Sequence, residues 1–188
     1  MKEAKIKTHV LWISPKFPHD HPRKGEPTYF VERIQLALNL LVQMPGDLLI
    51  DLEPKLHTCR ADSKNSKKKK GAYEEWKRKI DEVNRGEAIL SVRMWSGSAY
   101  NRLHDGSKPV EIAQFDKDSG CGVQKLEFYE DKDEIPSIKY PIINNFSEPK
   151  IEDIAENDGL SLHDFKAWFR KADLSKPVAI IQFTKFRY

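Results

Sequence analysis

The chain has 188 residues, of which 39% are hydrophobic and 32% charged, and its formal net charge is +3 at pH 7. This apolar fraction lies above that of disordered chains, so we expect one compact unit with a hydrophobic core and a heavily charged surface. A net charge of +3 does not by itself indicate a polyanionic partner, so any basic surface must be local.

The cysteine content and the hydropathy pattern indicate a cytoplasmic protein. Cys59 and Cys121 are the only cysteines, which excludes a disulfide framework and a structural zinc site built from paired cysteines. No stretch approaches membrane-spanning length, and the N-terminal residues lack the apolar segment of a secretory signal. We therefore expect no membrane partner.

The N-terminal part predicts a strand, a loop and a helix. Residues 8–14 form a short apolar run that predicts a buried strand. Residues 16–26 are rich in proline, histidine and charge, which is typical of a loop. A helix is expected from Pro27 onward, because apolar residues recur at helical spacing until Pro45.

The middle of the chain predicts a β region interrupted by one helix. Residues 55–60 alternate as a short strand, and the lysine-rich segment 63–71 predicts a solvated loop. A helix is expected over residues 73–84, ending near Gly86. Further strands are predicted over residues 88–95, 109–115, 123–129 and 138–143.

The C-terminal part predicts two short helices and a final strand. Residues 151–156 form a helix that stops near Gly159. Ser161 and Asp164 have the spacing of a capping box, and the helix they begin carries aromatic residues on one side. Residues 177–184 predict a buried strand.

Several short motifs, taken in order, resemble a known family. They are Lys-x-x-Thr-x-Arg at residues 55–60, a helix with a tryptophan, a Gly-Glu pair before the β region, and Gly-Leu-Ser before the last helix. This order resembles the ASCH domain of the PUA-like superfamily over residues 50–188, with residues 1–49 as a strand-loop-helix extension packed on the barrel. The resemblance implies an α+β fold with a partly open β-barrel flanked by helices, and a cleft that accepts RNA or nucleotides.

The same resemblance places three residues in this cleft, namely Lys55, Thr58 and Arg60. A few relatives hydrolyse acylated cytidine with a lysine, a threonine and a carboxylate, and Lys55 and Thr58 match the first two. Asp158 stands at the third position, where those relatives usually have glutamate, and Glu156 is the alternative counterpart. No cofactor is implied.

The chemistry of the Lys-x-x-Thr-x-Arg segment leaves two interpretations open. A threonine hydroxyl is a weak nucleophile unless a base takes its proton, and Lys55 can do so only if burial or a cation such as Arg60 lowers its pKa. Strand alternation puts Lys55 and Thr58 on opposite faces, so their cooperation requires a bulge or turn. Otherwise Lys55 and Arg60 are surface charges and Thr58 is a strand former.

A second candidate surface follows the strand predicted over residues 88–95. Arg93, Trp95 and Tyr100 could pair with phosphates and stack on bases, although Trp95 equally fits a place in the core. The lysine run at residues 67–70 could contact phosphates or form a solvated loop.

Metal binding and several enzyme classes are not expected. His19 and His21 could ligate a metal together with His57 and Cys59, but a solvated polar loop is the preferred interpretation of the histidine pair. The chain has no glycine-rich phosphate loop, no Gly-x-Ser-x-Gly elbow and no zinc-deaminase signature.

The sequence therefore predicts an ASCH-like, RNA-related module that binds nucleic acid or a nucleotide. The alternative is an amidohydrolase that removes an acyl group from a modified cytidine nucleoside. The expected partner is RNA or a nucleoside or nucleotide ligand, and the sequence leaves the oligomeric state open.

Overall fold

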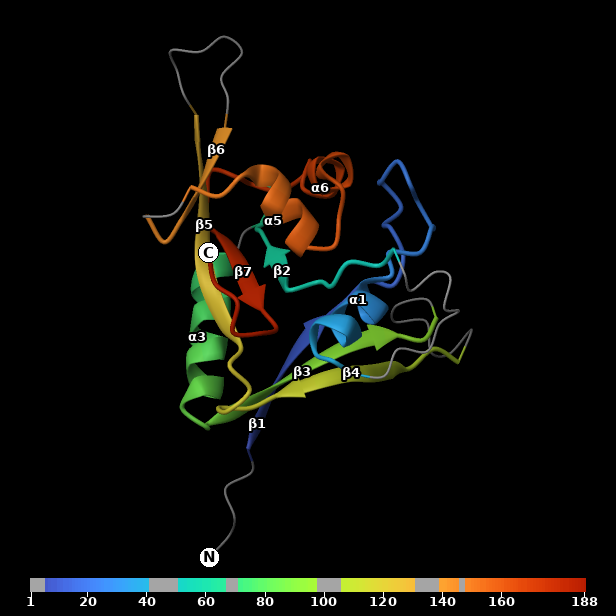
Figure 1. The fold of residues 1–188 in the computed structure, drawn as a ribbon, viewed down its shortest axis with the longest axis vertical. Helices are drawn as coiled ribbons and strands as arrows, with labels where there is room; N and C mark the ends of the chain where they lie inside the picture. The colour runs from blue at the N-terminus through green and yellow to red at the C-terminus, as the bar shows by residue number, and fades with distance from the viewer. Residues whose placement is uncertain (1–5, 41–50, 67–70, 98–105, 131–138, 146–147) are drawn as a thin grey trace, which may run out of the picture.

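The computed structural model describes residues 6–40, 51–66, 71–97, 106–130, 139–145 and 148–188. These residues form an α+β fold with four helices, seven strands and two separate sheets (Figure 1). The described strands do not close into a single barrel, so the PUA-like barrel expected from the sequence is not confirmed.

The first sheet has three strands in the order β1-β3-β4. The N-terminal strand pairs in parallel with β3, and β4 pairs antiparallel with β3 on its other side. Leu11, Leu90 and Val92 are fully buried on the face of this sheet that meets the core. The strands are β1 (Lys7–Trp12), β3 (Ala88–Trp95) and β4 (Pro109–Phe115).

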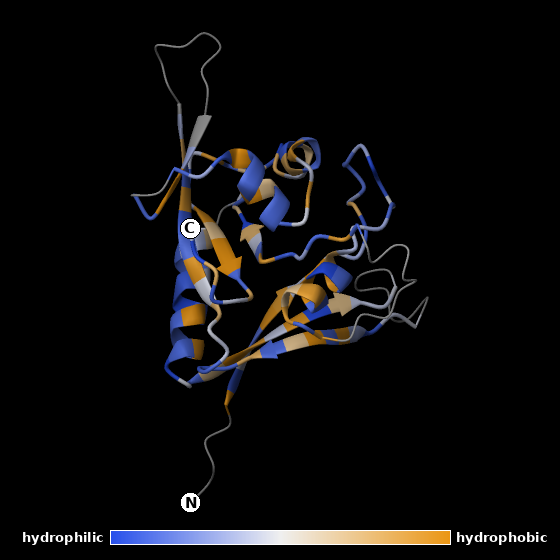
Figure 2. Cartoon of the chain, in the orientation of Figure 1, coloured by the Kyte–Doolittle hydropathy of each residue, from blue (hydrophilic) through white to orange (hydrophobic). Residues whose placement is uncertain are grey.

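The second sheet has four strands in the order β2-β7-β5-β6, and all its pairs are antiparallel. Every residue of β7 is buried, and the strand is coloured almost throughout as hydrophobic in Figure 2. A continuous apolar run is expected for a strand that is covered on both faces. The strands are β2 (His57–Arg60), β5 (Gly122–Glu130), β6 (Lys139–Ile143) and β7 (Val178–Gln182).

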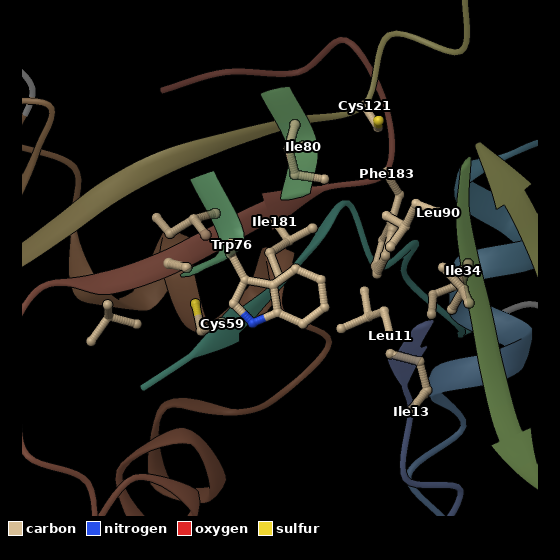
Figure 3. Close-up of a cluster of buried hydrophobic side chains, with 14 of the residues drawn as sticks. Leu11, Ile13, Ile34, Cys59, Trp76, Ile80, Leu90, Cys121, Ile181 and Phe183 are labelled. Atoms are coloured by element: carbon tan, nitrogen blue, oxygen red, sulfur yellow. The ribbon is translucent and has the colours of Figure 1, made fainter. Parts of the chain in front are cut away.

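Helix α3 joins the two sheets through the core. It contacts β3 of the first sheet and both β5 and β7 of the second. Trp76 and Ile80 point inward from α3 and lie close to Ile181 of β7 and Leu11 of β1 (Figure 3). The helices are α1 (Phe30–Ala37), α3 (Ala72–Asn84), α5 (Ile151–Asn157) and α6 (Leu162–Trp168). No helix within the described ranges has both the length and the hydrophobicity needed to cross a bilayer.

Helix α1 is shorter than predicted at both ends. Pro27 and Thr28 belong to the preceding loop, where Pro27 forms a bridge with Lys16 and the Thr28 amide donates to a carbonyl of the loop. At the other end Asn39 has a φ of 54°, and its amide and that of Leu40 close a Schellman motif. The periodic pattern did not reveal this stop, and residues 41–50 lie outside the described part.

The other predicted elements are largely confirmed. Strand β2 begins two residues later than the predicted strand over 55–60, because the Lys55 and Leu56 amides donate to carbonyls of α1 and α5. The Leu56 carbonyl accepts from the amide of Phe183, just after β7. Helix α3 and strands β3 to β5 and β7 fall close to their predicted ranges. In α6 the Ser161 hydroxyl accepts from the Asp164 amide, which confirms the predicted cap. The lysine run at residues 67–70 lies outside the described residues.

Candidate functional site

Lys55 is completely buried just before β2. Its ammonium group donates to the carboxylate and to the backbone carbonyl of Asp158, and lies 4.1 Å from the centroid of the Phe30 ring. The two side chains are 1% and 5% exposed, so they form a buried ion pair. The interpretation of Lys55 as a surface charge is therefore wrong.

The end of α5 positions Asp158. The helix stops in a Schellman motif in which Gly159 has a φ of 74° and its amide donates to the Glu156 carbonyl at 2.7 Å. A Cβ at Gly159 would lie 3.1 Å from the Arg33 side chain and 3.5 Å from that of Lys55. Glycine is therefore needed here both for the left-handed backbone and for close packing beside Lys55.

Asp158, and not Glu156, is the carboxylate beside Lys55. Glu156 is exposed and faces a separate hollow of about 450 Å³ that Arg33 and Asp164 also line. Asp158 is 3% exposed and also lies 3.4 Å from the Cys59 amide, with its Oδ1 toward that donor. Of the two candidate carboxylates, Asp158 therefore contacts Lys55, although the relatives that the sequence resembles usually have glutamate at this position.

Thr58 does not join the Lys55–Asp158 pair. Its hydroxyl accepts a hydrogen bond from the Arg60 guanidinium at 3.0 Å, and within the described residues no hydrogen bond connects it to Lys55. Strand β2 pairs with β7 in regular register, so no bulge brings Thr58 to the other face. Thr58 is buried, as expected for a residue inside a sheet that is covered on both sides.

Arg60 joins the two sheets. Its guanidinium donates to Thr58 Oγ1, to the Cys59 carbonyl and, at 2.5 Å, to the Trp12 carbonyl at the end of β1. Burial lowers the pKa of Arg60, an effect that the charge of Asp158 opposes. Arg60 also lines a small hollow of about 250 Å³ together with Lys171 and other residues. Its role as a free surface charge is therefore wrong.

His57 and Cys59 lie on the Asp158 side of β2. Their ligand-type atoms and those of Asp158 lie within 4.8 Å of one another, and all three side chains are buried. These are metal-ligating residue types, but the Lys55 ammonium already occupies the Asp158 carboxylate. Two neighbouring cations, Lys55 and Arg60, oppose the entry of a metal ion by charge repulsion.

The histidine pair of the N-terminal loop lies elsewhere. Across the described ranges neither His19 nor His21 belongs to a metal-type cluster. His21 is buried and stacks on Phe17 with a centroid distance of 4.4 Å, and its ring lies 3.2 Å from the Asp164 carbonyl. The solvated-loop interpretation is wrong for His21 because this side chain packs the loop onto α6.

Burial dominates the electrostatics of the pair. It lowers the pKa of Lys55 and raises that of Asp158, and the attraction between the two charges opposes both shifts. Burial and the adjacent Lys55 charge lower the pKa of His57 well below its usual value, and a backbone contact with Ile154 offsets this only in part. Both His57 ring nitrogens lack a hydrogen-bond partner within the described chain. Burial also raises the pKa of the Cys59 thiol, so this cysteine is a neutral, unreactive group.

A stacked tryptophan pair lies at the ends of β1 and β3. The Trp12 and Trp95 rings are 5.1 Å apart with an interplanar angle of 10°, and both are half-buried. Arg93 pairs with Trp12 in the sheet, donates to Ser91 Oγ at 2.7 Å, and its side chain is 33% exposed. The structure thus brings the predicted residues Arg93 and Trp95 together, while the predicted residue Tyr100 lies outside the described part.

Sequence reasoning missed Trp12 as a member of this group. Trp12 fits the apolar pattern of a buried strand, and only the parallel pairing of β1 with β3 places it beside Trp95. A tryptophan near the end of the predicted strand was the only signal that the sequence offered.

Compared with known proteins, the sequence matches no family model and no curated protein, and the structure matches no solved structure. The resemblance to ASCH domains therefore stays a prediction.

The substitution Lys55→Met removes one partner of the buried ion pair and leaves the Asp158 charge unpaired. We expect the free energy of unfolding to fall by about 3–5 kcal/mol in urea titrations at pH 7. Combining it with Asp158→Asn removes both charges and is expected to restore most of this loss. Lys77→Met, at a half-exposed ion pair with Asp81, is the matched control and is expected to cost less than about 1 kcal/mol. Equal effects of Lys55→Met and Lys77→Met would contradict the buried pair.

The buried neutral His57 makes stability depend on pH. Because its pKa is lowered in the folded state, only the unfolded chain takes up this proton as the pH falls below 6.5. The free energy of unfolding then decreases by up to about 1.4 kcal/mol per pH unit from this group. We expect His57→Gln to remove this part of the slope between pH 6.5 and 5. His163→Gln, at an 80% exposed side chain, is expected to keep the wild-type slope. A His57→Gln slope equal to the wild-type slope would show that this imidazole is protonated in the fold.

Proposed function

We propose that the chain binds a nucleotide or a short single-stranded RNA segment at the surface formed by Trp12, Arg93 and Trp95. The parallel stack of Trp12 on Trp95 beside an arginine is the observation that carries this proposal. Aromatic side chains at strand ends stack on unpaired bases, and arginines pair with the adjoining phosphates. The weak overall charge is consistent with such a local site.

Arg60 contacts the backbone of this surface at Trp12. Its guanidinium donates to the Trp12 carbonyl, so it lies at the same strand end as the tryptophan pair. The hollow of about 250 Å³ beside Arg60 is also lined by Trp168, by Lys171, which pairs with Asp20, and by Asp62. A phosphate in this hollow and a base on the tryptophan pair would use both features.

An ASCH-like assignment, with a partly open barrel of the PUA-like kind, is part of the same proposal. It is supported by the order of the sequence motifs and by the buried position of the Lys-x-x-Thr-x-Arg segment between the helices and the sheets. Each of its three polar residues has a hydrogen-bond partner. Lys55 donates to Asp158 after α5, Thr58 accepts from Arg60, and Arg60 donates to the Trp12 carbonyl of β1.

An amidohydrolase acting on an acylated cytidine is the second candidate. It is favoured by one observation: Lys55 is held beside a carboxylate and burial lowers its pKa, as a catalytic base requires. Against it, the Thr58 hydroxyl is on the other face of β2 and is bonded to Arg60. Because ligand binding would have to bring Thr58 and Lys55 together, the binding function is the better supported of the two.

Binding can be measured by fluorescence anisotropy with a labelled pyrimidine-rich oligoribonucleotide at low salt. We expect affinity that falls as salt rises, and a loss of about tenfold in Trp12→Leu, since one base stack is worth about 1–3 kcal/mol. Arg93→Gln should reduce both the affinity and the salt dependence. Lys77→Gln on α3 removes an equal charge away from this surface and should leave binding nearly unchanged. Absence of binding, or equal effects of all three variants in folded protein, would refute the proposal.

The two candidates are separated by incubating the protein with acetylated cytidine and following acetate release. The binding function predicts no release above that of buffer. Release by the wild type that is lost in Thr58→Val, which keeps the side-chain shape but removes the hydroxyl, would instead establish the amidohydrolase. Thr184→Val, at a threonine after β7, is the control for the substitution itself.

A further inference from the structure

A second hollow of the described chain lies between α6 and the second sheet. It has a volume of about 640 Å³. Its walls are mainly apolar and come from α5, α6 and strands β5 and β7. The apolar residues that line it include Leu126, Phe128, Ile151, Phe165, Phe169 and Val178.

The rim of this hollow is cationic. Three positive side chains, Lys64, Lys166 and Arg170, line it together with one carboxylate, Asp173. That carboxylate is already engaged, because it accepts from the Ser175 hydroxyl at 2.5 Å and pairs with a lysine outside the hollow at 3.2 Å. These contacts also lower the pKa of Asp173, so it stays ionised and paired.

The three cations are not neutralised to the same degree. Lys64 and Lys166 form no ion pair with any carboxylate of the described residues. Arg170 lies 3.7 Å from Asp20, but Lys171 holds the same carboxylate more closely, at 2.7 Å. A positive rim therefore remains available to a ligand.

We infer that this hollow binds a small amphiphilic anion, with an apolar chain or ring packed against the Phe165–Phe169 pair and a carboxylate at the Lys166–Arg170 rim. The volume lies in the range of small-molecule sites, which combine apolar walls with a few well-placed polar groups. The two aromatic rings are 4.8 Å apart, and the cations Lys166 and Arg170 follow them by one position in the sequence, Lys166 on α6 and Arg170 just after its end. Neither the tryptophan pair nor Arg93 lines this hollow, whereas Phe169 also lines the small hollow beside Arg60.

The test uses the full chain and anilinonaphthalene sulfonate, an apolar anionic fluorophore. We expect fluorescence enhancement on mixing, and displacement of the dye by decanoate below its micelle concentration. Decanol has the same chain length without the charge, so it should compete at least about tenfold more weakly, and decyltrimethylammonium should compete least.

Two variants test the assignment of residues. The double charge reversal Lys166→Glu with Arg170→Glu should abolish the preference for decanoate over decanol. Lys77→Glu with Arg85→Glu makes the same change in charge on α3 and at its C-cap and should preserve that preference. Ser175→Trp, at an exposed residue of the rim, should block dye and decanoate alike.

Three results would overturn the inference: no dye binding by the folded chain, equal competition by decanoate and decanol, or an unchanged preference after the Lys166 and Arg170 reversal. Since the charge reversal affects exposed side chains only, it remains informative even if the tryptophan variant does not fold.

Discussion

The placement of strand β2 depends on the buried contact between Lys55 and Asp158. A charged group that is removed from water needs an opposite charge at hydrogen-bonding distance. The Lys55 ammonium, just before β2, must therefore contact the Asp158 carboxylate at the end of α5, and this contact fixes where the two segments pack. Backbone bonds reinforce the same point, since the Lys55 amide donates to the Arg33 carbonyl and the Leu56 amide to that of Asn157. Helices α1 and α5 thus hold the start of a strand whose other face bonds, through Arg60, to the first sheet.

Local patterns predicted most of the secondary structure. Period-two runs located β3 and β4, and the glycine and serine signals located the ends of α3, α5 and α6. The end of α1 was missed because Asn39, which can adopt a left-handed conformation at modest cost, takes the place of the usual glycine. Such a stop depends on a single residue and leaves no trace in hydrophobic periodicity.

The candidate site was harder to predict because it depends on long-range pairing. Alternation along the chain correctly indicated that Lys55 and Thr58 point in opposite directions. The family resemblance offered Asp158 or Glu156 as the carboxylate near Lys55, and only the structure shows that Asp158 is the one in contact. The contact between Trp12 and Trp95 arises from a parallel pair more than eighty positions apart in sequence, and no local property encodes that register. The degree of burial of Lys55 and Arg60 likewise follows from elements that lie far from them in the chain.

The two cationic regions of the surface differ in the apolar groups that accompany them. Beside Arg93 the neighbouring apolar surface consists of flat, stacked indoles at the ends of strands. Beside Lys166 and Arg170 it is the concave wall of a hollow between a helix and a sheet. A flat aromatic platform suits planar rings with attached phosphates, whereas a concave apolar wall suits a flexible chain or an isolated ring. Similar charges can therefore select different ligands on one small fold.

The hydrogen bond from Arg60 to the Trp12 carbonyl also affects how copies of the chain meet one another. Strand β1 is at the edge of its sheet, and an edge strand with unpaired carbonyls is a template for strand addition from a neighbouring molecule. Arg60 occupies one of these acceptors with a cation from within the same chain. A second molecule that added a strand there would have to displace this half-buried guanidinium, so the residue that connects the two sheets also opposes edge-to-edge aggregation at this end of β1.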